Sequence, residues 1–432
     1  MDLKDSKPPS HVPEEKAREH AHYSIKKFLA HSTFGFESWD NFQIEHEPLL
    51  IKDLNGHLLF YEYTVNDGKK PLGLIRVAAS KIIGSTTLQI QITPRGWDPH
   101  LAIKKAKEKV KEYLPKTKII SADFISYSYP KIGVSINVED SEIGEGSLIF
   151  DAGSFDFVEP IGDFGREGAI SWSFYNSIAL PKAEVREKRW NALDKEMASL
   201  KESVEGLGEE SSTKIDKLSL QQNLLAAQHD HAMKVSRIGH KYRLKKDLET
   251  ETWTIKPTEF CTQKIIKHSP LFCKNHKTNS GFSQQKTDYC AVATGQMILD
   301  FYRYYYSQDE IASAMGYAHE NGGCTPEGQV AGYTKLSNNS LKASVDTGPT
   351  WDKAAAEIDA NRPLKSGIPG HSRACFGYKV ANFWDINMPR PMWLFIFDPW
   401  PPNSDFCKGN HTWEDWYSIP HTNFIYASHI SK

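Results

Sequence analysis

The spacing of apolar and polar positions divides the first part of the chain into short strands and helices. Residues 14–31 place apolar side chains at helical spacing and predict an amphipathic helix. Residues 57–65 and 72–80 are rich in aromatic and β-branched side chains, and they flank the turn sequence Asn66-Asp67-Gly68, which predicts a β-hairpin. A second helix is expected over 98–114, and further strands are expected at 87–94, 118–127, 131–138 and 147–157.

The pattern changes after about residue 180. The stretch 180–248 is rich in Lys, Glu, Ala and Leu and is interrupted at Gly206-Leu207-Gly208, which predicts two helices, 182–205 and 213–243, as a hairpin or linker. The last part predicts helices followed by strands. The fold class expected is therefore α+β, in four segments: a flexible tail 1–13, an N-terminal α+β domain 14–178, the helical segment 180–248 and a C-terminal domain 255–432.

Composition narrows the classes of function. The 432 residues are 39% hydrophobic and 25% charged, as in a globular protein, and the net charge of -2 gives no basic field for nucleic acid. No run of about 18 apolar residues occurs, so no transmembrane segment is expected. The first residues lack the apolar stretch of a signal peptide, which favours a cytoplasmic protein, or a secreted one if an export signal has been removed.

Cysteine and histidine spacing gives little support for a metal site. All six cysteines lie from Cys261 onward and are interpreted mainly as buried thiols, with pairing of Cys261 and Cys273 left open. Cys273-x2-His276 does not match a zinc finger or ribbon, and His229 and His231 point to different faces of the predicted helix. We therefore expect no metal and no cofactor.

One cysteine lies where a nucleophile is readily made. From Cys290 onward the apolar spacing is helical, and Asp288 or Tyr289 precedes the helix, so Cys290 is in its first turn. Unpaired N–H groups and the positive end of the helix dipole favour a thiolate at that position. The side-chain amide of Gln284, together with the backbone N–H of Cys290, would form an oxyanion hole.

A thiolate nucleophile needs a general base and a group that orients the base. His371 is the best candidate base, and the residues after it predict a short strand ending at a Gly377-Tyr378 turn. Asp398 is the best candidate orienter, because the apolar strand 393–398 delivers its carboxylate and Pro399 ends the strand.

These three motifs together resemble the papain-like cysteine peptidases, and among them the bacteriocin-leader (double-glycine) peptidase group. The motifs are Gln-x5-Cys at a helix start, His-x5-Gly-Tyr, and Asp-Pro after an apolar strand. The resemblance covers about residues 280–430 and implies a papain-like domain with a helical half and an antiparallel sheet. It implies one role for each candidate: nucleophile for Cys290, base for His371, orienter for Asp398, and oxyanion donor for Gln284, with Gln285 as a near alternative.

The sequence departs from that family in places. Ala291 follows the cysteine where Gly or Trp is usual, and the gap between His371 and Asp398 is long. The aromatic segment 400–417 either lines a groove or packs as a cover. Residues 14–94 resemble the cystatin-like and PepSY-type propeptide units of some peptidases, which implies a regulatory N-terminal region.

The leading hypothesis is a cysteine peptidase that cleaves a peptide or isopeptide bond of a peptide or protein substrate through an acyl-enzyme. The alternatives are transglutaminase- or amidase-like acyl transfer with the same triad, and a papain-like domain that only binds. Intramolecular inhibition by the N-terminal region and cleavage within 158–260 are part of the hypothesis. Cys375 lies four residues after His371, and it is either a second thiol near the site or, by preference, part of the core.

Overall fold

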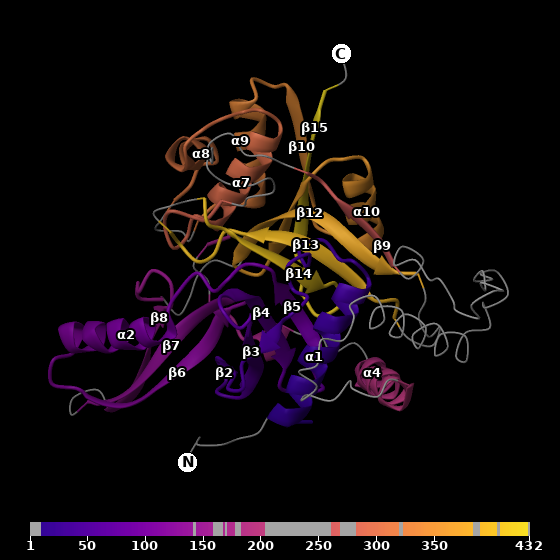
Figure 1. The fold of residues 1–432 in the computed structure, drawn as a ribbon. Helices are drawn as coiled ribbons and strands as arrows, with labels where there is room; N and C mark the ends of the chain where they lie inside the picture. Colours follow the sequence, from indigo (N-terminus) through magenta and orange to yellow (C-terminus); the bar gives the residue numbers. More distant parts are fainter. Residues whose placement is uncertain are drawn as a thin grey trace, which may run out of the picture.

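A single 15-stranded sheet runs through the chain, with helices on its faces (Figure 1). The strand order along the main path is β10-β15-β11-β12-β13-β14-β5-β4-β3-β2-β6-β7-β8, while β1 pairs with β3 and β9 with β12. This mixture of helices and largely antiparallel strands confirms the α+β class. The computed structural model describes residues 10–140, 144–158, 167–168, 171–177, 183–203, 261–267, 282–318, 323–382, 389–403 and 407–430.

The first helix packs on the N-terminal strands, as predicted. Its apolar stripe buries Ala17, Ala21, Ile25 and Phe28, which is the face that the sequence spacing indicated. The predicted hairpin is present as antiparallel β3 and β4. The elements of this layer are α1 (Glu14–Ala30), β1 (Gln43–Ile44), β2 (Leu49–Asp53), β3 (Leu58–Asn66), β4 (Pro71–Ala78) and β5 (Thr87–Gln91).

The second helix covers the far end of the sheet. Asp98 is its N-cap, accepting a hydrogen bond from the Leu101 N–H at 2.8 Å, and Pro99 occupies the first turn. The strands beside it follow the predicted positions, except that the third ends at Asp151 rather than 157. These elements are α2 (Pro99–Tyr113), β6 (Lys118–Ser128), β7 (Lys131–Asp140) and β8 (Gly144–Asp151), followed by α3 (Phe174–Ser177) and α4 (Ala183–Ser203).

The C-terminal part has a helical half and a sheet half. Figure 1 shows α7, α8 and α9 grouped on one side of β12 and α10 on the other. Ser307 and Glu310 form a capping box at the start of α8, and Thr325 and Thr350 cap α9 and α10. The elements are β9 (Cys261–Ile265), α7 (Cys290–Phe301), α8 (Gln308–Ala314), α9 (Pro326–Leu336), β10 (Leu341–Asp346), α10 (Trp351–Asp359), β11 (Leu364–Ile368), β12 (His371–Ala381), β13 (Met392–Asp398), β14 (Asn410–Asp415) and β15 (Asn423–His429).

The N-terminal and C-terminal strands join where β5 pairs with β14, with Ile90 opposite Trp413. One hydrophobic core extends across this junction, and Phe28 of α1 packs edge-on against Trp393 of β13 at a centroid distance of 5.0 Å. A second core lies among α7, α8 and α9. The two parts of the chain therefore share backbone pairing and buried apolar surface.

Three predictions need correction or lie outside the described residues. The tail predicted at 1–13 does not extend through Val12, which is buried and whose N–H donates to the Ala79 carbonyl at 2.9 Å. The Gly377-Tyr378 turn is wrong: β12 continues, and its register shifts at Gly377, where a Cβ would lie 2.7 Å from the Lys264 carbonyl oxygen of β9. The predicted helix 213–243, with His229 and His231, lies outside the described residues.

No helix in the described ranges combines the length and the apolar character needed to cross a membrane.

Candidate active site

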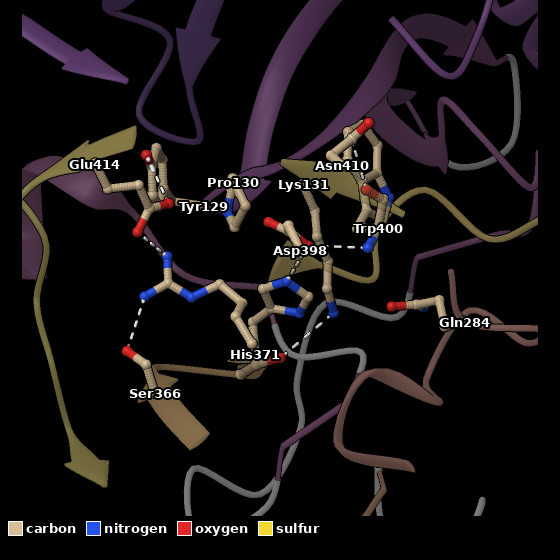
Figure 2. A network of polar contacts seen from close by, with 12 residues as sticks. Tyr129, Pro130, Lys131, Gln284, Ser366, His371, Asp398, Trp400, Asn410 and Glu414 are labelled. Carbon is tan, nitrogen blue, oxygen red and sulfur yellow. Dashed lines mark hydrogen bonds and ion pairs between the residues drawn. The ribbon is translucent and has the colours of Figure 1, made fainter. Parts of the chain in front are cut away.

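His371 and Asp398 meet at the ends of two neighbouring strands. His371 opens β12 and Asp398 closes β13, and the antiparallel pairing of these strands brings both side chains to one edge. His371 Nε2 lies 2.9 Å from Asp398 Oδ1, which also accepts the Trp400 N–H at 2.9 Å (Figure 2). Asp398 therefore fixes the orientation of the imidazole. Nδ1 of the ring is buried and has no hydrogen-bond partner among the described residues.

Burial controls the protonation of this pair. It lowers the pKa of His371 to about 4, although the Asp398 carboxylate acts in the opposite direction. Burial alone would raise the pKa of Asp398, but the contacts with His371 and Arg373 outweigh it and hold the pKa below its ordinary value. In this state the imidazole is neutral at pH 7 and the carboxylate is ionised.

Cys290 is the first residue of α7, as predicted. Tyr289 is the N-cap, and its side chain accepts no hydrogen bond from the N–H groups of the first turn. The thiol is fully buried and accepts a hydrogen bond from the backbone N–H of Ser372, the residue after His371. The sulfur therefore lies beside the start of β12, where it contacts the backbone of the residue that follows His371.

The thiol does not have the lowered pKa expected at a helix N-terminus. Burial raises the pKa of Cys290 to about 11, with Lys131 lowering it and Glu167 raising it. Desolvation thus outweighs the effects of Lys131 and the Ser372 N–H, which lower the pKa. The site holds a protonated thiol beside a neutral imidazole.

Gln284 lies at the site, but its side-chain oxygen, and not its NH₂ group, faces the catalytic residues. Its Nε2 donates to the carbonyl oxygens of Lys286 at 2.9 Å and Thr287 at 2.6 Å. Its Oε1 is buried without a partner among the described residues, and Figure 2 shows that oxygen turned toward Lys131 and His371. An oxyanion donor at Gln284 requires the amide to turn over. Gln285, the alternative, is exposed.

A buried lysine from the N-terminal sheet reaches the site, and sequence reasoning missed it. Lys131 is fully buried, and its Nζ donates to the carbonyl oxygens of Gly168 at 2.5 Å and Gly370 at 3.3 Å. Figure 2 shows its Nζ beside the imidazole of His371. In the sequence it is one more polar position of an alternating strand, so only the pairing of distant segments reveals it.

A second buried charge pair, which sequence reasoning also missed, lies on β12, the strand that carries His371. Arg373 Nη1 donates to Glu414 Oε2 at 2.5 Å, and Arg373 Nη2 donates to Ser366 at 3.3 Å. Tyr129, which precedes Pro130 and Lys131, donates its hydroxyl to Glu414 at 3.4 Å (Figure 2). The loop that carries Lys131 is thereby tied to the strand that carries His371.

The N-terminal part of the chain covers the catalytic centre from several directions. Trp172 Nε1 donates to the Pro369 carbonyl at 2.7 Å, and Gly168 contacts Lys131. Thr287, between Gln284 and Cys290, donates to Ser154 at 3.0 Å and also contacts Asp156. Because Cys290 and His371 are both fully buried, a substrate cannot reach them in this state.

The predictions for the other cysteines have different outcomes. Cys375 is buried in the main core, with its thiol 3.5 Å from the Gly377 carbonyl, so the preferred core interpretation holds. The pairing of Cys261 with Cys273, which the sequence left open, does not form: the buried Cys261 thiol is not part of a disulfide, whereas Cys407 is disulfide-bonded. Cys273, His276 and His268 lie outside the described residues, and within those residues no group of three or more potential metal ligands occurs.

The aromatic segment 400–417 packs rather than lining an open groove. Trp400 is buried and donates its Nε1 to Asp151 at 2.8 Å. Trp413 is buried and donates to the Phe34 carbonyl at 3.1 Å. Both contacts are with the N-terminal part of the chain, so this segment belongs to the junction of the two parts.

Comparison with known proteins gives one informative match. Residues 276–417 match the model of the Peptidase_C39 like family. No curated protein sequence matches the chain.

Two solved structures show distant likeness. One is a double glycine motif protease from an AMS/PCAT transporter in complex with the leader peptide, at 12% identity and a TM-score of 0.25, covering 39% of this chain and 99% of that one. The other is UfSP from C. elegans, at 14% identity and a TM-score of 0.26, covering 39% of this chain and 38% of that one. Scores this low add nothing to the family match. The match to the Peptidase_C39 like family over residues 276–417 therefore locates the likeness to cysteine peptidases in the C-terminal part of the chain.

Proposed function

We propose that the protein is a cysteine peptidase in which Cys290 is the nucleophile, His371 the general base and Asp398 the group that orients the base. One observation carries the proposal. The buried His371–Asp398 contact of 2.9 Å lies at the strand edge where the Ser372 N–H contacts the Cys290 thiol at the start of a helix. The family match over residues 276–417 supports the same chemistry.

The proposed proton steps are based on the hydrogen bonds of the imidazole. Since Nε2 of His371 is engaged by Asp398, Nδ1 is the ring nitrogen left to take the thiol proton. The thiolate then attacks the substrate carbonyl carbon, and the backbone N–H of Cys290 stabilises the oxyanion. The protonated imidazole gives its proton to the leaving amine, and water, activated by the imidazole, hydrolyses the thioester and regenerates the thiol.

The described state is a resting form. A thiol with a pKa near 11 beside an imidazole with a pKa near 4 does not form an ion pair at neutral pH. Opening the site admits water, which reduces the desolvation that causes both shifts. We therefore expect the reactive thiolate only after the cover has moved.

The test is labelling with iodoacetamide at pH 7, with the modified cysteine located by mass spectrometry. It uses the full chain in the wild type and in a Glu167→Ala background, which removes a side chain of the cover. We expect fast labelling at Cys290 in the Glu167→Ala chain, slowed at least about 100-fold by a further His371→Ala change. His46→Ala, at an exposed histidine, is the matched control and should leave the rate unchanged.

Two results would contradict the proposal. In one, Cys290 in the opened chain reacts no faster than the buried thiols Cys324 and Cys375. In the other, the loss of His371 has no effect on labelling. Peptide cleavage measured with and without an added amine then separates hydrolysis from the acyl-transfer alternative.

A further inference from the structure

A carboxylate from the N-terminal part of the chain sits in a buried polar pocket beside the catalytic centre. Glu167 is almost fully buried, and its Oε1 contacts the Nζ of Lys365 and accepts from Asn423 Nδ2 at 3.1 Å. Its Oε2 accepts from Gln329 Nε2 at 2.8 Å. Both carboxylate oxygens are therefore held by donors of the C-terminal part.

The pocket is built from both halves of the papain-like domain. Gln329 comes from α9 in the helical half, whereas Lys365 and Asn423 come from β11 and β15 in the sheet. Space for the occupant is kept by Gly367, where a Cβ would lie 2.7 Å from Glu167 Oε1. Donors that converge on one carboxylate from two sides are an arrangement for holding an acidic ligand.

The backbone of Glu167 is bound as an added strand would be. Its N–H donates to the Cys324 carbonyl at 3.0 Å, and its carbonyl accepts from the Cys324 N–H at 3.4 Å, which makes an isolated antiparallel bridge. Gly323 permits this approach, because a Cβ there would lie 2.1 Å from the Glu167 carbonyl oxygen. Peptides bind to many proteins through such main-chain pairing, with a side-chain pocket giving specificity.

The next residue connects the pocket to the chemistry. The Gly168 carbonyl accepts from Lys131, whose charge acts on both Cys290 and His371. Glu167 and Lys365 also act electrostatically on the Cys290 thiol. The Glu167–Gly168 pair thus lies close enough to the catalytic centre for Glu167 to act on the thiol and for Gly168 to hold Lys131.

We propose that Lys365, Asn423 and Gln329 form a substrate subsite for an acidic side chain, and that Glu167 of the chain itself occupies it in the resting form. The assignment as a substrate subsite rests on the proposed peptidase function. The preferred substrate is a peptide with Glu followed by Gly, and Glu167–Gly168 inhibits by holding the same contacts.

The charge in the pocket makes the preference strong. Lys365 is fully buried, and burial lowers its pKa although Glu167 acts in the opposite direction. Without Glu167 the lysine is therefore protonated most readily when another carboxylate enters. A peptide with a glutamate restores the pair, whereas one with glutamine offers only a neutral oxygen. An acidic peptide is therefore expected to bind best when Glu167 is absent.

The experiment measures binding without turnover. The full chain carrying Cys290→Ala and Glu167→Ala is titrated calorimetrically with the blocked tetrapeptide Arg-Glu-Gly-Ala and with Arg-Gln-Gly-Ala. We expect the glutamate peptide to bind at least about tenfold more tightly than the glutamine peptide. Cys290→Ala alone, with Glu167 in place, should bind the glutamate peptide at least about tenfold more weakly than the double variant.

Two pocket variants in the double-variant background locate the preference. Lys365→Met and, as a near-isosteric change less prone to misfolding, Gln329→Glu should each abolish the preference for glutamate. Lys353→Met, at an exposed lysine of α10 paired with Asp346, is the matched control and should keep it. Circular dichroism and thermal unfolding verify that each variant is folded.

The outcomes separate this inference from the proposed function. Equal binding of the two peptides, or a preference that survives both pocket variants, overturns the subsite whatever the labelling of Cys290 shows. A glutamate preference that depends on Lys365, combined with an unreactive Cys290, keeps the pocket as a peptide-binding site and overturns the peptidase.

Discussion

Two buried carboxylates, Glu62 and Glu167, are paired with cations in different ways. Glu62 on β3 lies directly opposite Arg76 on β4 in the strand register, and the two are 2.7 Å apart, with Arg95 at 2.8 Å on the other oxygen. Glu167 and Lys365 are 198 positions apart in the sequence, and the backbone of Glu167 pairs with the C-terminal part through the one-residue bridge to Cys324.

The difference lies in what must break to separate the charges. The Glu62 pair is part of a hairpin, so it is lost only when the sheet unfolds. The Glu167 pair can exchange its carboxylate for another while β11 and β15 remain paired. Buried ion pairs of similar chemistry thus serve structure in one region and ligand exchange in the other.

The largest expected effect is on the structural pair. Glu62→Gln leaves Arg76 and Arg95 without their shared carboxylate, and we expect a loss of about 3–5 kcal/mol in the free energy of unfolding, measured in urea. Lys353→Met breaks only an exposed pair and should cost less than about 1 kcal/mol. A loss for Glu62→Gln as small as that of the control would show that the Glu62 ion pair does not stabilise the sheet.

Glu167→Gln should cost less stability but alter the site. Lys365 keeps its contact with Asn423, and the new amide oxygen still accepts, so we expect a loss of about 1–3 kcal/mol. Labelling of Cys290 with iodoacetamide should become faster, because the cover is held less firmly. The matched Glu62→Gln chain should show no such increase below its unfolding transition, and equal rates in both would contradict the comparison.

Lys131 connects the two regions, because the carbonyl of the preceding Pro130 accepts from Arg76 at 3.0 Å. Its charge lowers the pKa of Cys290, so Lys131→Met should raise that pKa. At fixed pH between 7 and 9, labelling slows about tenfold for each pKa unit gained. The pH profile of labelling measures this shift, with Lys105→Met at an exposed helix position as control.

The smallest effect is a pH dependence. Burial works to raise the pKa of Glu62, but Arg76 and Arg95 outweigh it and hold the pKa below its ordinary value of 4.5. The stability that Glu62 contributes is therefore fully present above about pH 4.5 and is lost as the pH falls through the folded pKa. Glu62→Gln should remove up to about 1.4 kcal/mol per pH unit of that acid-side slope, and an unchanged slope would exclude this role.

The periodic elements were predictable from local pattern. The helix at 14–30, the hairpin at 58–78 and the caps at Ser307 and Thr325 follow from spacing and cap chemistry within a few residues. Cys290, His371 and Asp398 were placed because each lies at the end of such an element. Their roles remain a prediction.

The rest depends on distant pairing. Lys131, Glu167 and Lys365 are ordinary polar residues in sequence, and only the folded chain shows that they are buried together near Cys290. The orientation of the Gln284 amide likewise depends on backbone carbonyls of a loop without a periodic pattern. Desolvation, which reverses the expected pKa of Cys290, is also a property of the whole fold.

The pairing of β5 with β14 determines what a cut between the two parts of the chain would produce. A nick anywhere between residues 203 and 261 severs the covalent link but leaves the strand junction and its shared core intact. The two fragments would remain a noncovalent complex, because separating them exposes β14 as an unpaired edge together with buried aromatic surface. Proteolytic processing of that kind would yield a two-chain enzyme rather than a released propeptide.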